Sequence, residues 1–291
     1  IADTVRIIES YADVIIIRNP WEGSAQVAAD YASVPVVNAG DGAHEHPTQT
    51  LLDLYTIRRE KGRLHDVSVA LVGDLRYGRT VHSLAFGLAR FGAKVTCVAP
   101  EGLEMPSHLV ARLEREFGCT PQQYRSLEEI VTGPETVKRQ PGRQKALASE
   151  VLSLFDAFYV TRVQQERFES QQAYERARSS YAFTRQLIAR ARPDALVMHP
   201  LPRVDELAYE VDRDPRAAYF RQAAYGVPVR MALLAAVLGR REVKVGRARK
   251  GEYRPQPRRE VDFRKLADLH CPNPRCVTRH EHYLTPRFTF V

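Results

Sequence analysis

The stretch Val67-Ser-Val-Ala-Leu-Val-Gly-Asp-Leu-Arg-Tyr-Gly-Arg79-Thr-Val-His-Ser83 contains the pattern that decides the fold. Residues 67–73 open with a short, valine-rich apolar run, which is typical of a strand buried in a parallel sheet. A glycine-containing turn follows, and residues 79–91 are predicted to form a helix. A strand, a turn and a helix in this order predict a βα unit, whose ligands would gather after the strand.

The same pattern continues on both sides of this stretch. Short apolar runs alternate with longer segments that are predicted to be helical. Such alternation favours the α/β class, with parallel sheets covered by helices on both faces. Further strands are expected at residues 14–18, 34–38, 94–99, 156–161 and 195–199, and further helices at 22–31, 48–61, 106–117 and 229–238.

Composition limits the other classes of function. The chain has 291 residues, 44% hydrophobic and 27% charged, as in an ordinary globular protein. Its apolar runs are too short to cross a membrane, no signal peptide is visible, and four cysteines make no disulfide framework, so we expect a cytoplasmic enzyme. The net charge is +8, but residues 239–259 carry nine basic and two acidic side chains. A local basic linker favours neither nucleic-acid nor membrane binding.

Polar motifs follow the predicted strands. Arg18 ends the first strand, and a glycine-rich turn leads to His46-Pro-Thr-Gln49 at the start of a helix. Arg79 begins another helix, and the motifs Thr161-Arg-Val-Gln164 and His199-Pro-Leu-Pro-Arg203 follow later strands. Helix N-termini and arginine side chains both favour anions. The sequence therefore predicts one anion-binding site at the carboxyl ends of several strands.

Taken together and in this order, these motifs resemble the catalytic chain of aspartate carbamoyltransferase over about residues 1–243. The resemblance implies two doubly wound parallel-sheet domains. Residues 1–48 with 228–243 would bind carbamoyl phosphate, and residues 49–227 would bind aspartate. It also implies transfer of a carbamoyl group from carbamoyl phosphate to L-aspartate, an early step of pyrimidine biosynthesis, with no catalytic metal or cofactor and in a homotrimer that shares its active sites between subunits.

The resemblance assigns the carbamoyl-phosphate roles residue by residue. Arg18 and His46 would be catalytic, contacting the phosphate and the carbonyl oxygen, and a neutral imidazole would suffice as the donor. Gln49 would hold the carbamoyl amide. Pro200 and Leu201 would present backbone carbonyls, because the Leu201–Pro202 bond is expected to be cis.

The aspartate roles fall on a second group of side chains. Arg79 would bind the α-carboxylate, and Arg162 with Gln164 would bind the side-chain carboxylate, with Leu201 also in contact. An arginine at this place would repel the cationic side chain of ornithine, which separates the chain from the ornithine-using relatives. Two alternatives stay open: a non-catalytic assembly subunit with this fold, or a carbamoyltransferase that uses another amino acid.

Some family features do not occur in this sequence. The phosphate-binding Ser-Thr-Arg-Thr motif and the loop that carries a serine and a lysine into the neighbouring site are both missing. We therefore expect an N-terminally truncated chain whose residues 1–291 alone have almost no turnover. Residues 132–149, which are rich in proline, glycine and basic side chains, are expected to be a surface insertion.

The C-terminal part contains a further motif. Cys271-Pro-Asn-Pro-Arg-Cys276 resembles the opening of the zinc domain of the aspartate carbamoyltransferase regulatory chain. We expect a basic linker at residues 244–265 and a partial zinc module at 266–291, which could support a higher assembly. Four ligands are needed, so either two more cysteines follow in a longer chain, or His280 and His282 complete a variant site, or the thiols are free. We expect residues 260–291 to be poorly ordered and to bind zinc weakly.

Overall fold

The computed structural model describes residues 1–127, 129, 154–162, 172, 182–239, 271–281, 283 and 284. The expected insertion at 132–149 and the expected linker at 244–265 lie outside the described residues. So do two of the residues singled out above, Gln164 and His282.

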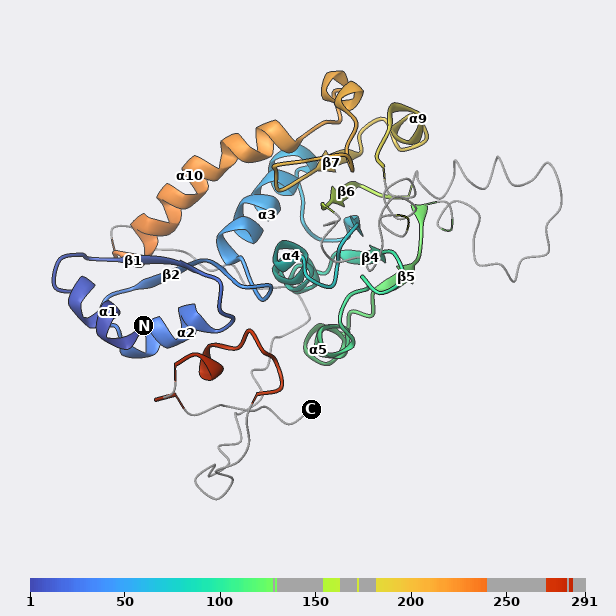
Figure 1. The fold of residues 1–291 in the computed structure, drawn as a ribbon. Coiled ribbons are helices and arrows are strands. Elements are labelled where there is room, and N and C mark those ends of the chain that lie inside the picture. Colours follow the sequence, from blue (N-terminus) through green and yellow to red (C-terminus); the bar gives the residue numbers. More distant parts are fainter. Residues whose placement is uncertain are drawn as a thin grey trace.

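A five-stranded sheet forms the larger part of the molecule (Figure 1). All its neighbouring strands are parallel. Its order is β5-β4-β3-β6-β7, so the chain moves outward from β3 in one direction and then returns to the other side of β3. The switch point therefore lies between β3 and β6, where Val72 pairs with Val160. The strands are β3 (Ser68–Val72), β4 (Lys94–Val98), β5 (Gln122–Tyr124), β6 (Ala157–Val160) and β7 (Leu196–Met198).

Both faces of this sheet are buried. Alternate side chains of β3 enter two different cores: Val69 and Leu71 pack on one side, and Ala70 and Val72 on the other. The first core is closed by α4 (Arg79–Arg90) and α5 (Ser107–Phe117). The second is closed by α9 (Arg185–Ile188), the short helix η2 (Tyr209–Arg213) and the start of α10. Two covered faces explain why β3 is apolar at every position after Ser68.

A smaller unit contains the N-terminal elements. Its strands β1 (Ile15–Asn19) and β2 (Val36–Asp41) pair in parallel, with an irregular register between Ile17 and Asn19. The helices α1 (Ala2–Ile8) and α2 (Ser24–Tyr31) lie beside them in Figure 1. The α/β class with parallel sheets is thus confirmed, and the smaller sheet has two strands among the described residues.

Two long helices join the units. α3 (Pro47–Lys61) packs against α10 (Tyr219–Val237) and also against α4 and β2 (Figure 1). The expected helix at 229–238 was too short, because Pro228 lies inside α10 instead of before it. Proline removes one backbone donor and disfavours a helix interior. Here Tyr55 of α3 packs edge-to-face on Tyr225, and Arg221 pairs with Glu60, so contacts with α3 hold the N-terminal half of α10.

The segment 271–281 packs on the smaller unit, although we expected poor order there. The backbone N–H of Val277 donates to Glu22 O at 2.9 Å, and the N–H of Glu22 donates to Arg275 O at 2.9 Å. Val277 is buried, and His280 stacks on Trp21 with ring centroids 3.4 Å apart. An aromatic stack and a buried valine thus hold these residues against the loop before α2, and the poor order expected of residues 260–291 stays a prediction.

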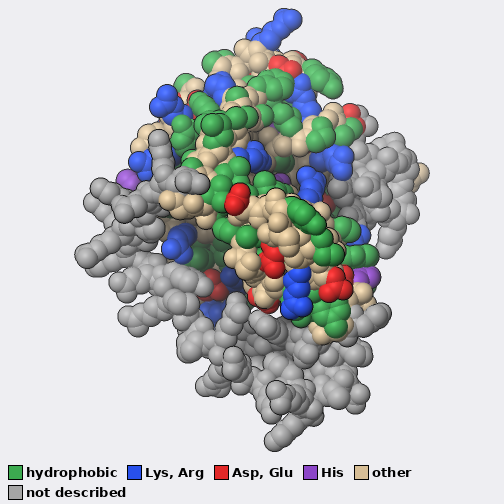
Figure 2. Space-filling view, turned by 90° about the vertical axis from the view of Figure 1, so that its left-hand side faces the viewer, with side chains coloured by type: hydrophobic (Ala, Val, Ile, Leu, Met, Phe, Trp, Pro, Cys, Tyr) green, Lys and Arg blue, Asp and Glu red, His purple; other side chains and the backbone are tan. Residues whose placement is uncertain are grey.

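Several apolar side chains are exposed on the face that carries β1 and α10. Ile16, Val227 and Met231 are each more than half exposed, and Figure 2 shows hydrophobic side chains spread between basic ones on this face. Among the described residues, no helix is both long and apolar enough to span a membrane.

Candidate active site

His46 sits at the N-terminus of α3, immediately before Pro47. Proline is favoured at a first helical position because its missing N–H would have no helical partner there. The backbone N–H of His46 donates instead to Ser83 Oγ at 2.9 Å, on α4. The imidazole is therefore anchored through its backbone by a neighbouring helix and stays half-buried.

The turn before His46 is organised by a buried carboxylate. Asp41 accepts hydrogen bonds from the backbone N–H of Gly23 at 2.8 Å, from Asn38 Nδ2 at 2.9 Å and from His44 Nδ1 at 2.9 Å. These bonds lower the pKa of Asp41 against the opposing effect of its burial, and the Asp41 carboxylate raises the pKa of His44. His44, which received no role from the sequence, thus helps to shape the turn.

Arg79 packs against the same turn. It begins α4, and its NH1 donates to Gly42 O at 3.1 Å. Gly40 has φ of +119°, and a Cβ there would lie 3.0 Å from Arg79 Cζ. A glycine at this position therefore leaves space for the guanidinium. Burial lowers the pKa of Arg79, and the positive charge of Arg18 lowers it further.

The charges around His46 keep its imidazole neutral. Its pKa is lowered from 6.5 to about 4, first by burial and then by the positive charges of Arg79, Arg18 and Arg230. Arg18 itself is exposed at the end of β1. Two residues that the sequence assigned to the site, Arg18 and Arg79, are thus brought close enough to His46 to act on its charge.

The ends of β3 and β6 touch at the switch point. Thr161 Oγ1 donates to Val72 O at 3.0 Å, and a Cβ on Gly73, whose φ is +114°, would lie 2.4 Å from Thr161 O. Only glycine fits position 73. Arg162 follows this contact and is exposed. The structure therefore places Arg162 at the carboxyl edge of the sheet, as the sequence predicted.

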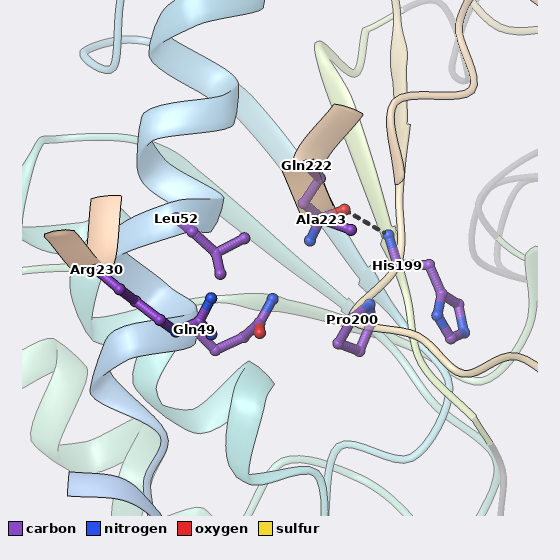
Figure 3. A pocket seen from close by; sticks show the side chains of 7 residues that line it. All are labelled: Gln49, Leu52, His199, Pro200, Gln222, Ala223 and Arg230. Carbon is purple, nitrogen blue, oxygen red and sulfur yellow. Dashed lines mark hydrogen bonds between the residues drawn. The ribbon is translucent and has the colours of Figure 1, made fainter. Parts of the chain in front are cut away.

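A cavity of about 210 Å³ opens between α3, α10 and the turn after β7 (Figure 3). It brings Gln49 and Pro200, both predicted from the sequence, next to Gln222 and Arg230, which were not predicted. The Arg230 side chain bends back along α10 toward Gly226. A Cβ at position 226 would lie only 2.4 Å from Arg230 NH1, so the glycine leaves room for the guanidinium. Gly226 and Arg230 are four residues apart and therefore lie on the same face of the helix. This spacing was the one signal in the sequence that could have placed the Arg230 side chain against α10. The cavity is lined by Gln49, Leu52, His199, Pro200, Gln222, Ala223 and Arg230.

The turn after β7 is tightly held. The Leu201–Pro202 peptide bond is cis, as the sequence predicted, and Leu201 has φ of +49°. The N–H of Leu201 donates to His199 Nδ1 at 2.8 Å, and His199 Nε2 donates to Glu206 Oε1 at 2.7 Å. Beyond the turn, Arg203 forms an ion pair with Asp212. Pro200, which lines the cavity, and the following Leu201 are thereby held in place.

Among the described residues, few possible metal ligands lie near the two cysteines of the C-terminal motif. Cys276 Sγ lies 3.3 Å from Thr278 Oγ1, and His280 stacks on Trp21 while its Nε2 donates to Pro274 O at 3.0 Å. Within the described part of the chain, no group of three or more His, Cys, Asp or Glu residues could hold a metal ion. Cys271, Cys276 and His280 therefore do not fit a closed four-ligand zinc site.

Two family models together match nearly all of residues 1–237. Residues 1–59 match the carbamoyl-phosphate-binding domain of aspartate/ornithine carbamoyltransferase, and residues 65–237 match its Asp/Orn-binding domain. The chain belongs to the aspartate/ornithine carbamoyltransferase family. Within that family, it is similar to the aspartate carbamoyltransferase catalytic subunit of Methanopyrus kandleri, with 50% identity over 82% of this chain and 71% of the relative. The corresponding subunit of Methanocella arvoryzae is 48% identical over the same shares.

Solved structures agree with these relatives. The catalytic subunit of M. jannaschii aspartate transcarbamoylase has a TM-score of 0.70 and 41% identity, covering 82% of this chain and 71% of that chain. The Trypanosoma cruzi enzyme in complex with carbamoyl phosphate has a TM-score of 0.69 and 40% identity, covering 80% and 68%. The same enzyme has also been solved with carbamoyl phosphate and aspartate together, at a TM-score of 0.68. Both comparisons therefore point to the aspartate-using branch.

Proposed function

We propose that this chain transfers the carbamoyl group of carbamoyl phosphate to the amino group of L-aspartate, giving N-carbamoyl-L-aspartate and phosphate. The observation that carries the proposal is the charge around His46. Three arginines, Arg18, Arg79 and Arg230, act on an imidazole that itself stays neutral. A cationic cavity with a neutral donor suits two anionic substrates, because it attracts both without adding a proton that the attacking amine could take up.

The reacting carbonyl would lie between His46 and Gln49. The amine nitrogen of aspartate attacks the carbonyl carbon, so that a C–N bond forms and the carbonyl oxygen becomes an oxyanion. The His46 N–H donates to this oxygen, and Arg18 lies beside it and the phosphate. Collapse breaks the C–O bond to phosphate, and the nitrogen gives up one proton to the leaving phosphate. Donors fixed where charge develops are the largest contribution in such reactions.

Aspartate would be bound by the opposite wall of the cavity. Arg79 binds its α-carboxylate, and Arg162 with Gln164 binds the side-chain carboxylate through a planar pair of bonds. Pro200 and Leu201 present backbone carbonyls to the carbamoyl amide and the incoming amine. Two contacts support this arrangement: Arg79 is held against the turn before His46 by its bond to Gly42 O, and Leu201 is held beside His199, which lines the cavity.

Further proposals rest on the resemblance. We infer a homotrimer with active sites shared between subunits, a carbamoyl-phosphate domain in residues 1–48 and 228–243, and an aspartate domain in 49–227. A structural zinc at Cys271 and Cys276 would need ligands outside the described residues. That residues 1–291 alone have almost no turnover also stays a proposal, so activity is best measured on the product of the whole gene.

A direct assay separates the alternatives. The full-length protein should form N-carbamoyl-aspartate from carbamoyl phosphate and L-aspartate, and it should use L-ornithine at least a hundredfold less well. Activity with ornithine would support a carbamoyltransferase for another amino acid. Binding of neither substrate by calorimetry would support a non-catalytic assembly subunit, and it would overturn the proposal.

A further inference from the structure

A buried carboxylate behind the cavity has no role in the chemistry described above. Asp53 lies on α3, one helical turn after Gln49, and is completely buried. Its Oδ1 accepts hydrogen bonds from Gln49 Nε2 at 2.9 Å and from Gln222 Nε2 at 2.6 Å. One oxygen thus ties α3 to α10, across 169 residues of sequence.

The second oxygen of this carboxylate is unusual. Asp53 Oδ2 and Tyr159 Oη are both buried and make no hydrogen bond of good geometry among the described residues, although the Tyr159 hydroxyl is near enough to lower the pKa of Asp53. A buried polar atom without a partner costs free energy. An apolar side chain of the same size would avoid this cost, so the stability of the fold alone does not account for an aspartate here.

The bond to Asp53 decides which atom of Gln49 faces the cavity. A glutamine amide can present either a donor or an acceptor, according to its orientation. Because Nε2 of Gln49 is committed to Asp53, its Oε1 is left as an acceptor at the cavity wall (Figure 3). A carbamoyl –NH2 group needs acceptors, and a reversed amide would place a donor against it.

The hydrogen bond from Gln222 to Asp53 also fixes the orientation of the Gln222 amide, which contacts the turn after β7. Gln222 Oε1 accepts the backbone N–H of His199 at 3.0 Å, the contact drawn dashed in Figure 3. His199 in turn accepts the N–H of Leu201 at Nδ1. If Gln222 reversed its amide, it would lose both of its bonds at once. Asp53 therefore fixes the two walls of the cavity from a single oxygen.

We propose that Asp53 is a positioning residue of the carbamoyl site, which orients the Gln49 and Gln222 amides so that both cavity walls present acceptors to one substrate –NH2 group. The inference deepens the proposed function and rests on it. Asp53 does not touch the substrate and acts only through the two amides.

The protonation state of Asp53 leaves this role intact. Burial raises its pKa from 3.8 to about 7, so both forms exist near neutral pH. A proton on Oδ2, the oxygen on which neither amide depends, leaves Oδ1 as a carbonyl acceptor for both amides. An asparagine offers the same carbonyl oxygen, and its amide nitrogen can donate toward Tyr159. The conservative variant should therefore preserve function, which a role in proton transfer would not allow.

Three variants of the full-length protein test the proposal. Asp53→Leu keeps the branched shape of the side chain and removes the acceptor, and we expect the KM for carbamoyl phosphate to rise at least tenfold. Asp53→Asn should stay within threefold of the wild type. Thr56→Val is the matched control, because Thr56 is another buried polar residue of α3 whose hydroxyl donates to Leu52 O at 2.7 Å, away from both amides. Its KM for carbamoyl phosphate should not change.

The outcomes are separable. A folded Asp53→Leu protein with wild-type KM for carbamoyl phosphate overturns the inference, and so does an Asp53→Asn protein as impaired as Asp53→Leu. If Asp53→Leu does not fold, Gln222→Leu decides, since it cuts the link to His199 and should raise the same KM several-fold. An unchanged KM there also overturns it. A wild-type protein without carbamoyl transfer to aspartate would instead remove the proposed function itself.

Discussion

The two walls of the site differ in how they are held. On the carbamoyl side, Gln49 is buried and hydrogen-bonded to a buried carboxylate, and His46 is anchored to α4 through its backbone. On the aspartate side, Arg162 follows the end of β6 and is exposed. The first wall is preorganised in the free protein, whereas the second is open to solvent. The difference teaches that the fold fixes Gln49 and His46 before any ligand is present, whereas the exposed Arg162 side chain can adjust to a ligand.

The largest expected effect sharpens this comparison on the buried side. His46→Ala removes the donor to the developing oxyanion, and we expect kcat to fall about 10²- to 10³-fold, as for the loss of one oxyanion donor. Because the donor acts in the transition state, the KM for aspartate should change little. Steady-state kinetics with each substrate varied would measure this. A loss confined to the KM for aspartate would place His46 in the wrong half of the site.

The next effect tests the open side. Arg162→Ala removes a bidentate carboxylate contact, and kcat/KM for aspartate should fall about a hundredfold or more, or ~3 kcal/mol in transition-state binding. Carbamoyl phosphate affinity, measured by calorimetry, should stay the same. Arg162→Lys is the control, since it keeps the charge and loses the planar fork. Equal losses for both substrates would mean that the two walls do not act separately.

A smaller effect concerns stability and pH. The raised pKa of Asp53, about 7, means that the folded protein holds a proton that the unfolded chain releases above pH 4. The unfolding free energy contributed by Asp53 therefore falls as pH rises from about 4 to 7. Asp53→Asn removes this loss, so the variant should gain about 2 kcal/mol on the wild type between pH 5 and pH 8. Urea unfolding at both pH values checks it, and a constant difference would contradict the burial argument.

The smallest effect is an expected absence of change. The pKa of His46 is lowered to about 4, so its imidazole should show no NMR titration between pH 8 and pH 6. When the pH falls below 6.5, the ordinary pKa of histidine, His46 takes up a proton in the unfolded chain before it does so in the folded protein. The stability contributed by His46 is thus complete above pH 6.5 and is lost as pH falls toward 4. A midpoint near 6.5 would show that the surrounding arginines do not act on it.

The sequence allowed most of the fold to be predicted, because the buried strands and glycine turns leave local signals. β3 was expected at residues 67–73 and is Ser68–Val72, and α3 was expected at 48–61 and is Pro47–Lys61. The first half of α10 was missed, since Pro228 outweighed a packing partner that no local pattern reveals.

The site was predicted unevenly for a similar reason. Arg18, His46, Gln49 and Arg79 belong to recognisable motifs. The structure brings Arg18 and Arg79 near His46, and Gln49 lines the cavity. Asp53 and Gln222 were missed, because their importance lies in a hydrogen bond between residues far apart in sequence. A buried polar network has no signature in a single sequence until the fold brings its members together.

The contact between Gly73 and Thr161 also constrains how the gene can change. Every side chain at position 73 would enter the space of a backbone carbonyl, and φ of +114° is open only to glycine. No missense change at this codon is then tolerated, however conservative the new residue. The turn after β3 and the start of the segment after β6 consequently keep a fixed spacing at Thr161, one residue before Arg162, so that a change in either one is felt by the other.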